Sequence, residues 1–289
     1  MLIPIFNVGE YVNDALNSIL NQTYENLEII VVDDGSSDDT FEKVQLISHS
    51  DHRLKLFRNP KNVKIVDTLN KAFSLSSGEY IARMDGDDIS DPARLETKLR
   101  FLMGNPHIDM VGCSVRRIDS EGYVTGQATF YSNEKFIVEA CKYTTPICHI
   151  WLARRSVYVL LNAYRNIPGA EDYDFCLRAI SSGLRLTNIE NYYGYDVRIG
   201  RVGNTSSQIG GRQRLLQKYV YELYLQRLSV GSDTFNEISM EASISQSLVS
   251  QLLFNISSWS LARLLNRRSV IDYTLSPFFA ISIFLSPLH

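Results

Sequence analysis

Residues 78–92 read GEYIARMDGDDISDP and place a short, mostly apolar strand directly before a cluster of acids. Asp85, Asp87 and Asp88 put three carboxylates within four positions. Such carboxylates repel one another, and a divalent cation among them offsets that repulsion because Mg²⁺ and Mn²⁺ prefer oxygen ligands. Residues 80–84 are predicted to form the strand, so the acids stand at its carboxyl end, where open α/β sheets bind ligands. The stretch therefore predicts an α/β fold with a metal site at the edge of its sheet.

The structural alternative for this stretch is an exposed acidic turn that precedes a helix. Asp91 followed by Pro92 matches a helix N-cap with proline at the first helical position. Leu95, Leu99 and Leu102 then continue as one apolar helical face. Capping accounts for Asp91 alone and leaves the three preceding carboxylates unexplained, so the metal-site interpretation is favoured.

The bulk composition describes an ordinary folded protein. The chain has 289 residues, of which 45% are hydrophobic and 21% charged, enough for one large domain or one domain with an appendage. The formal net charge of −3 gives no indication of a nucleic-acid partner. The four cysteines have no metal-like spacing and are predicted to be reduced core residues of a cytoplasmic protein. No signal peptide is visible, because the first residues lack a basic start.

The first 115 residues alternate strand and helix patterns, and this order predicts a mostly parallel sheet with helices on both faces. Predicted strands are 2–6, 27–32, 54–57, 80–84 and 110–113, with helices over 11–20, from about 39, and over 66–75. From 116 to 200 the pattern loosens. A hairpin turn is expected at 120–122, and helices at 156–161 and 173–181.

Two further acidic elements accompany the first. Asp33 and Asp34 close the second predicted strand, where one of them could cap the next helix or could accept the imide N–H of uracil, a donor that cytosine lacks. Glu171 and Asp172 begin a predicted helix, where the helix macrodipole alone favours acids. The catalytic interpretation is a general base that removes a proton from a sugar hydroxyl. His149 is a weaker candidate, because a lone histidine is more often structural.

Taken together, these elements resemble glycosyltransferase family 2, whose catalytic domain has the GT-A fold. The similarity covers roughly residues 1–200, and residues 82–90 most resemble the branch that builds bacterial capsules, exopolysaccharides and O-antigens. The matching stretches are 3–7, 18–24 running to 31–36, 78–95, 146–155 and 170–174. The resemblance implies an α/β GT-A fold (Rossmann-like, with a mostly parallel central sheet), and the helical spacing of apolar residues over 215–223 predicts a C-terminal helical tail. The predicted domains are a catalytic domain over 1–205, divided into a nucleotide-binding half (1–115) and an acceptor half (116–205), and a helical extension over 206–289.

The resemblance also implies roles for single residues. The implied nucleotide-sugar-binding residues are Pro4, Phe6, Glu10, Asp34 and Asp85, with the first three beside the nucleobase and Asp85 beside the ribose and diphosphate. The implied catalytic and metal-binding residues are Asp172 as base, Glu171 in support, and Asp87 as the direct ligand of Mn²⁺ or Mg²⁺, with Asp33, Asp88 and His149 as further candidates. Many members carry Arg-Asn where this chain has Leu69-Asn70, so the diphosphate lacks one cation that Lys64 or Lys71 would have to supply.

The implied reaction is an inverting transfer of a hexose or N-acetylhexosamine from a UDP-sugar to a hydroxyl of a saccharide, which is commonly lipid-linked in this branch. One alternative is a sugar-nucleotide nucleotidyltransferase, but residues 7–10 lack the glycine-rich, basic phosphate loop of that class. The other is a non-catalytic sugar-nucleotide-binding subunit of an assembly complex, which would have no use for the acids at 171–172.

The end of the chain suggests a membrane surface. Three arginines precede an aromatic-rich apolar run over 270–285. A spanning helix needs about 20 apolar residues, and Asp272 and Pro277 interrupt this run, so residues 259–289 are expected to lie in a membrane interface. The alternative is a helix packed on the catalytic domain or on a partner subunit, such as a second copy of the chain. The expected location is the cytoplasm, peripheral to the cytoplasmic face of a bacterial inner membrane.

Overall fold

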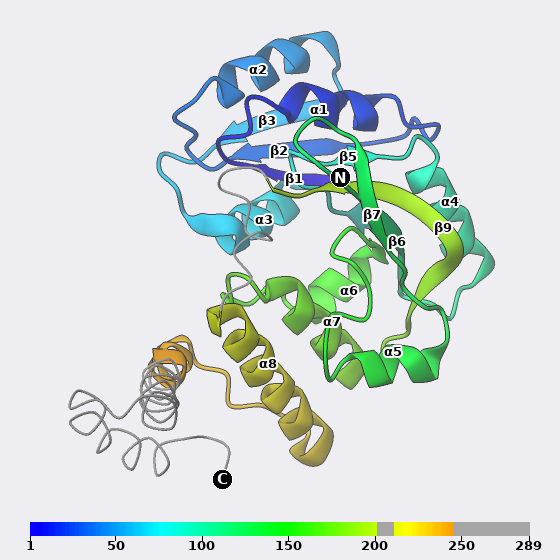
Figure 1. Cartoon of the computed structure of the whole chain (residues 1–289), viewed down its shortest axis with the longest axis vertical. Helices are drawn as coiled ribbons and strands as arrows, with labels where there is room; N and C mark the ends of the chain where they lie inside the picture. Colours follow the sequence, from blue (N-terminus) through cyan, green and yellow to red (C-terminus); the bar gives the residue numbers. More distant parts are fainter. Residues whose placement is uncertain (201–210, 246–289) are drawn as a thin grey trace, which may run out of the picture.

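A computed structural model describes residues 1–200 and 211–245 of the chain. The first strands form a parallel three-stranded sheet in the order β1-β2-β3. Helices α1 and α2 lie on one side of this sheet and α3 on the other (Figure 1). The bounds are β1 Leu2–Ile5, α1 Val12–Leu20, β2 Ile29–Asp33, α2 Thr40–Ser50, β3 Leu54–Arg58 and α3 Lys64–Leu75. The predicted parallel arrangement is confirmed for these three strands, whereas the predicted strands at 80–84 and 110–113 belong to a second, mixed sheet.

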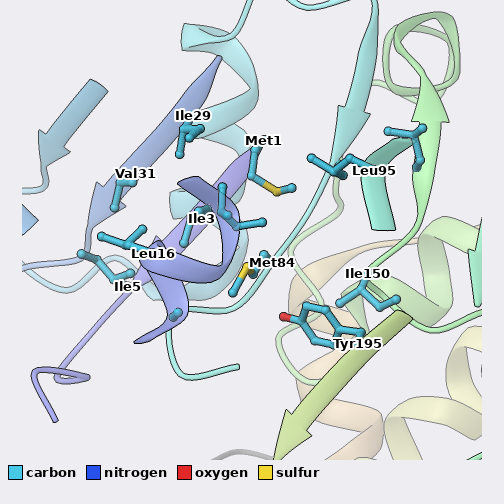
Figure 2. Packing of buried hydrophobic residues seen from close by; sticks show 14 of the residues in the cluster. Met1, Ile3, Ile5, Leu16, Ile29, Val31, Met84, Leu95, Ile150 and Tyr195 are labelled. Carbon is cyan, nitrogen blue, oxygen red and sulfur yellow. The ribbon is translucent and has the colours of Figure 1, made fainter. Parts of the chain in front are cut away.

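Alternation along β1 and β2 explains why both faces of this sheet are covered. Ile3 and Val31 pack in one apolar cluster with Leu16 of α1, on the face shown in Figure 2. Leu2 and Ile30 point the other way, into a second cluster that contains the buried residues of α3. Because both faces are buried, β1 and β2 are apolar at nearly every position. Each buried aliphatic side chain contributes roughly 1.5–3 kcal/mol.

The second sheet is mixed and has the order β4-β8-β6-β9-β5, with β7 paired to β6. Strands β6 and β9 are parallel, whereas the other pairs are antiparallel. A parallel bridge between Leu2 and Arg83 joins this sheet to β1. The strands are β4 Tyr80–Ala82, β5 Ile89–Ser90, β6 Met110–Ile118, β7 Val124–Ala128, β8 Leu152–Arg154 and β9 Leu186–Arg198. The antiparallel pair β6-β7 follows from its short connection, where Gly122 adopts a φ of 90° in the predicted turn.

The helix after the acidic stretch begins later than the sequence predicted. Helix α4 spans Arg94–Gly104 and its N-cap is Ala93, not Asp91. The Asp91 N–H donates to the Gly194 carbonyl at 3.1 Å, which keeps Asp91 beside β9. Its carboxylate instead accepts the Ala93 N–H at 3.0 Å in the turn that leads into the helix.

The remaining described helices are α5 Glu134–Ala140, α6 Arg155–Leu160, α7 Glu171–Ser181 and α8 Gly211–Val230. Helix α8 shares an apolar cluster with α7, in which Tyr173 and Leu177 meet Leu216 and Val220. The predicted boundary near residue 205 and the segment 259–289 lie outside the described residues. Within the described residues, no helix combines the length and apolar character that a membrane crossing requires. All four cysteines are buried and free of disulfides.

Candidate active site

A cavity of about 530 Å³ opens where the chain leaves β1, β2 and β4. Most of the predicted site residues line it, although they come from distant parts of the chain. Those residues are Pro4, Phe6, Asp34, Asp85, Asp87, Asp88, His149, Glu171 and Asp172. Glu10 and Asp33 are not among the lining residues. The structure therefore brings all three acidic elements to one pocket.

Residues 85–88, which we call the acidic loop, lie directly on β1 because Gly86 has no side chain. A Cβ atom at Gly86 would stand 2.5 Å from Cγ2 of Ile5, closer than side-chain atoms approach. Glycine thus allows the backbone contact that brings the carboxylates to the end of the sheet.

A buried arginine holds the far side of the acidic loop. The Arg198 N–H donates to Asp88 Oδ1 at 2.7 Å, and its Nε donates to the Asp87 carbonyl at 2.8 Å. Arg198 Nη1 also donates to the carbonyls of Asp119 and Ser120. The end of β9 therefore fixes the position of the acidic loop.

The acidic loop and His149 form a donor set that suits a divalent cation. Asp85, Asp88 and His149 can each offer one ligand atom, and these atoms lie within 4.8 Å of one another. His149 Nε2 lies 3.2 Å from Asp85 Oδ2, yet this buried atom makes no hydrogen bond of good geometry with any described residue. Carboxylate oxygens are the ligands that Mg²⁺ and Mn²⁺ prefer, and imidazole nitrogen is a ligand of several transition metals. Asp87 lines the same cavity but lies outside this trio, and its role as direct ligand stays a prediction.

The electrostatics of the acidic loop also favour a bound divalent cation. Burial and then the charges of Asp87 and Asp85 raise the pKa of Asp88 well above its usual value. The pKa of Asp85 is instead held well below its usual value, because the charges of Arg83 and His149 outweigh the effect of burial. A bound cation would relieve the repulsion that raises the pKa of Asp88.

Asp33 and Asp34 have separate environments. Asp34 Oδ1 accepts hydrogen bonds from Asn59 Nδ2 and the Val63 N–H, and Oδ2 accepts from the Lys64 N–H at 2.9 Å. Its carboxylate therefore stands in the cavity wall, fixed by the start of α3. Asp33 is fully buried, caps the Ser36 N–H and pairs with Arg58 Nε at 3.0 Å. Asp33 thus organises the turn and does not reach the pocket.

Glu171 and Asp172 occupy the first turn of α7. Phe175 anchors helix α7 in the core, where its ring stacks on that of Trp151 with the two centroids 5.3 Å apart. Glu171 is buried, and its Oε1 lies 3.3 Å from Arg83 Nη1. Burial and the charge of Asp172 raise the pKa of Glu171, while Arg83 opposes that rise. Asp172 is half-buried and lines the cavity.

Sequence reasoning missed several lining residues, including Arg83, Arg198 and Gln213. An arginine only two positions before the first acid was a signal for Arg83, but its long-range partner could not be read from spacing. The structure also separates the two cations considered for the diphosphate. Lys64 lines the cavity, whereas Lys71 does not, and its Nζ donates to Asn59 Oδ1 and the Arg58 carbonyl.

A family model described as glycosyl transferase family 2 matches residues 1–160, more than half of the chain. The chain therefore belongs to glycosyltransferase family 2. An uncharacterized glycosyltransferase of Haemophilus influenzae is 30% identical over 260 residues, covering 83% of this chain and 78% of that protein. Putative glycosyltransferase EpsE of Bacillus subtilis is 35% identical and covers 66% of this chain and 69% of its own. The O-antigen biosynthesis glycosyltransferase WbnJ of Escherichia coli is 29% identical, and the match covers 63% of this chain and 71% of that protein.

Solved structures agree on the fold. TarS of S. aureus in complex with UDP-GlcNAc superposes with a TM-score of 0.65 at 18% identity, covering 99% of this chain and 80% of that chain. The mannosyltransferase PcManGT of Pyrobaculum calidifontis, in complex with GDP-Man and Mn²⁺, superposes with a TM-score of 0.56 at 16% identity. The match covers 98% of this chain and 83% of that chain. The fold is GT-A, as the sequence predicted.

Proposed function

We propose that this glycosyltransferase moves a hexose or N-acetylhexosamine from a UDP-sugar to a saccharide hydroxyl, with inversion and with the help of a divalent cation. The observation that carries the proposal is that Asp34, Asp87 and Asp172 line one cavity of about 530 Å³. This volume falls within the usual range of small-molecule sites. The neighbour that binds UDP-GlcNAc supports a nucleotide-sugar donor.

The nucleobase would lie between Pro4 and Phe6 and the carboxylate of Asp34. Phe6 is 41% exposed at the cavity wall, so its ring is free to stack on a base. Asp34 has a second lone pair on Oδ2 for the uracil imide, since Oδ2 accepts from the Lys64 N–H and Oδ1 carries the other two hydrogen bonds. The exposed Lys64 would face the diphosphate in place of the arginine that other members carry.

The acidic loop and His149 would hold the cation, with Asp87 as the predicted direct ligand. When bound, a divalent cation neutralises the negative charge that develops on the departing diphosphate. The Mn²⁺ in the PcManGT complex supports this assignment. Arg198 and Gly86 keep the loop in place for this role.

Asp172 would act as the general base. Its carboxylate takes the proton of the acceptor hydroxyl while that oxygen attacks the anomeric carbon from the face opposite the diphosphate. A single displacement inverts the configuration and needs no covalent sugar–enzyme intermediate. The presence of Glu171 and Asp172 at the cavity favours a catalytic site over a non-catalytic binding subunit. Family membership argues against the nucleotidyltransferase alternative.

The acceptor would be a lipid-linked saccharide of a surface polysaccharide, and the enzyme would work on the cytoplasmic face of the membrane. The relative named for O-antigen biosynthesis supports a surface polysaccharide as the product. Membrane contact through residues 259–289 belongs to the same proposal, because a peripheral enzyme could reach a lipid-linked acceptor without spanning the bilayer.

A donor screen tests the proposed function. We would measure UDP release from UDP-glucose, UDP-galactose and their N-acetyl forms with Mn²⁺, with EDTA, and with GDP-mannose as the comparison donor. We expect metal-dependent release of UDP from at least one UDP-sugar. Turnover of GDP-mannose without turnover of any UDP-sugar would overturn the donor assignment, and equal turnover in EDTA would overturn the metal.

A further inference from the structure

Arg83 is a nearly buried cation that contacts two acidic elements at once. Its side chain is 5% exposed, directly after β4. Arg83 Nε lies 3.2 Å from Asp85 Oδ1, and Nη1 lies 3.3 Å from Glu171 Oε1. A guanidinium can make both contacts because its N–H donors form a rigid, planar fork. One side chain thus connects the acidic loop with the start of α7.

Glu171 also contacts the turn that precedes α7. Its second oxygen, Oε2, accepts the Gly169 N–H at 2.9 Å. Gly169 has a φ of 91°, a conformation that glycine adopts without strain. The Gly169 carbonyl accepts a hydrogen bond from Gln213 Nε2 of α8 at 3.2 Å. The turn is therefore held by Arg83 from one side and by α8 from the other.

The direction of Asp172 depends on this arrangement. Glu171 and Asp172 are consecutive residues of a helix, and consecutive helical side chains point about 100° apart. Arg83 holds Glu171 at the cavity wall, and this contact fixes the first turn of α7, from which Asp172 also faces the cavity.

We propose that Arg83 is a positioning residue that acts through Glu171. It fixes Asp172 relative to the acidic loop, so that the base that deprotonates the acceptor and the carboxylates that would bind the metal lie around the same donor sugar. The proposal rests on the proposed function, because it takes Asp172 as the base. It goes beyond that function by assigning the alignment of the two halves of the site to Arg83, which lines the cavity and acts through Glu171.

The alternative is an ion pair that only supports folding, and a double-mutant cycle separates the two. We would measure kcat and KM for UDP release, together with thermal stability, in Arg83→Met, Glu171→Gln and the double variant. We expect Arg83→Met to lower kcat by about 10²-fold, with KM within about threefold, since a displacement near 1 Å has costs of this size. In the Glu171→Gln background, Arg83→Met should lower kcat by less than about threefold, because the contact between Arg83 and the Glu171 carboxylate is already lost.

Two further variants complete the test. Arg83→Lys keeps the buried charge but cannot contact both carboxylates, so we expect kcat to stay well below wild type even where Arg83→Met fails to fold. Arg155→Met is the matched control, because Arg155 donates to the carbonyls of Ser76 and Gly78 and does not line the cavity. We expect its kcat to equal that of wild type.

Losses from Arg83→Met and Glu171→Gln that multiply in the double variant would overturn the proposal. A raised KM with unchanged kcat would also overturn it, since Arg83 would then be a donor-binding residue. Near-normal turnover of Asp172→Asn would instead show that the proposed base is wrong. The double-mutant cycle measures the coupling between Arg83 and Glu171 separately from that result.

Discussion

His149 Nε2 lies 3.2 Å from Asp85 Oδ2, where the segment before β8 meets the acidic loop. The imidazole therefore stands beside the carboxylates that are predicted to bind the metal. A histidine that only packed against the core would not need this position.

We expect His149→Gln to weaken the apparent affinity for Mn²⁺ by at least about tenfold, because a ligand or close neighbour of the ion is lost. Titration of UDP release with Mn²⁺ measures this affinity. The control is His107→Gln, which changes an exposed histidine outside the cavity. Identical Mn²⁺ dependence in wild type and His149→Gln would remove His149 from the metal site.

We expect Asp34→Asn to raise KM for the UDP-sugar by about tenfold or more, since a buried acceptor is replaced by a group that also donates. Calorimetric titration with UDP would report the same loss. The neighbouring variant Asp33→Asn should lower thermal stability while leaving KM near wild type, because Asp33 pairs with Arg58 away from the cavity. Unchanged UDP affinity in Asp34→Asn would contradict the base-binding role.

We expect Gly86→Ala to reduce both stability and activity, because its Cβ would meet Ile5 Cγ2 at 2.5 Å. Overpacking of this kind costs about 1–3 kcal/mol. Gly126→Ala is the control, since no atom of the described residues lies within 4 Å of a Cβ there. Adding Ile5→Ala to Gly86→Ala should restore part of the activity, and a complete lack of restoration would count against the steric explanation.

Lys98 gives a pH-dependent prediction for stability. The side chain is fully buried, its Nζ donates to the Ile150 carbonyl at 2.7 Å, and burial lowers its pKa from 10.5 to about 8. The unfolded chain therefore binds this proton more tightly, so stability is lowest below about pH 8 and recovers as the pH rises toward 10.5. Lys98→Met should raise the free energy of unfolding at pH 7 by up to roughly 3 kcal/mol.

Urea unfolding at pH 7 and pH 9.5 tests the Lys98 prediction. The gain from Lys98→Met should shrink at the higher pH, whereas Lys218→Met, which changes an exposed lysine, should have little effect at either pH. A gain that is equal at both pH values would show that proton binding by Lys98 is not the cause.

The sequence was most informative where local patterns decide structure. The apolar runs of β1 and β2 predict buried strands because both faces of that sheet are covered. The pairs β5-β9 and β6-β8 could not be predicted, since β5 and β8 are only a few residues long and depend on tertiary pairing. Strand β9 alternates irregularly because its register against β6 shifts after Ile189, where Glu190 and Asn191 are exposed.

The same division applies to the site. Clusters of acids at strand ends and a helix start can be recognised from spacing, and they converge on one cavity. The contacts that hold them, such as Arg83 with Glu171 and Arg198 with Asp88, join distant segments. Spacing carries no information on which distant side chains meet, so Arg83 and Arg198 were not found. The corrected N-cap at Ala93 has the same origin, because β9 holds Asp91.

The central claim is that Asp172 is the base of a site shared with Asp34 and the acidic loop. Its most direct test is steady-state turnover of Asp172→Asn beside UDP binding in the presence of Mn²⁺. We predict unchanged UDP affinity and a kcat lower by about 10²–10⁴-fold, the usual contribution of a general base. Turnover close to that of wild type would contradict the account.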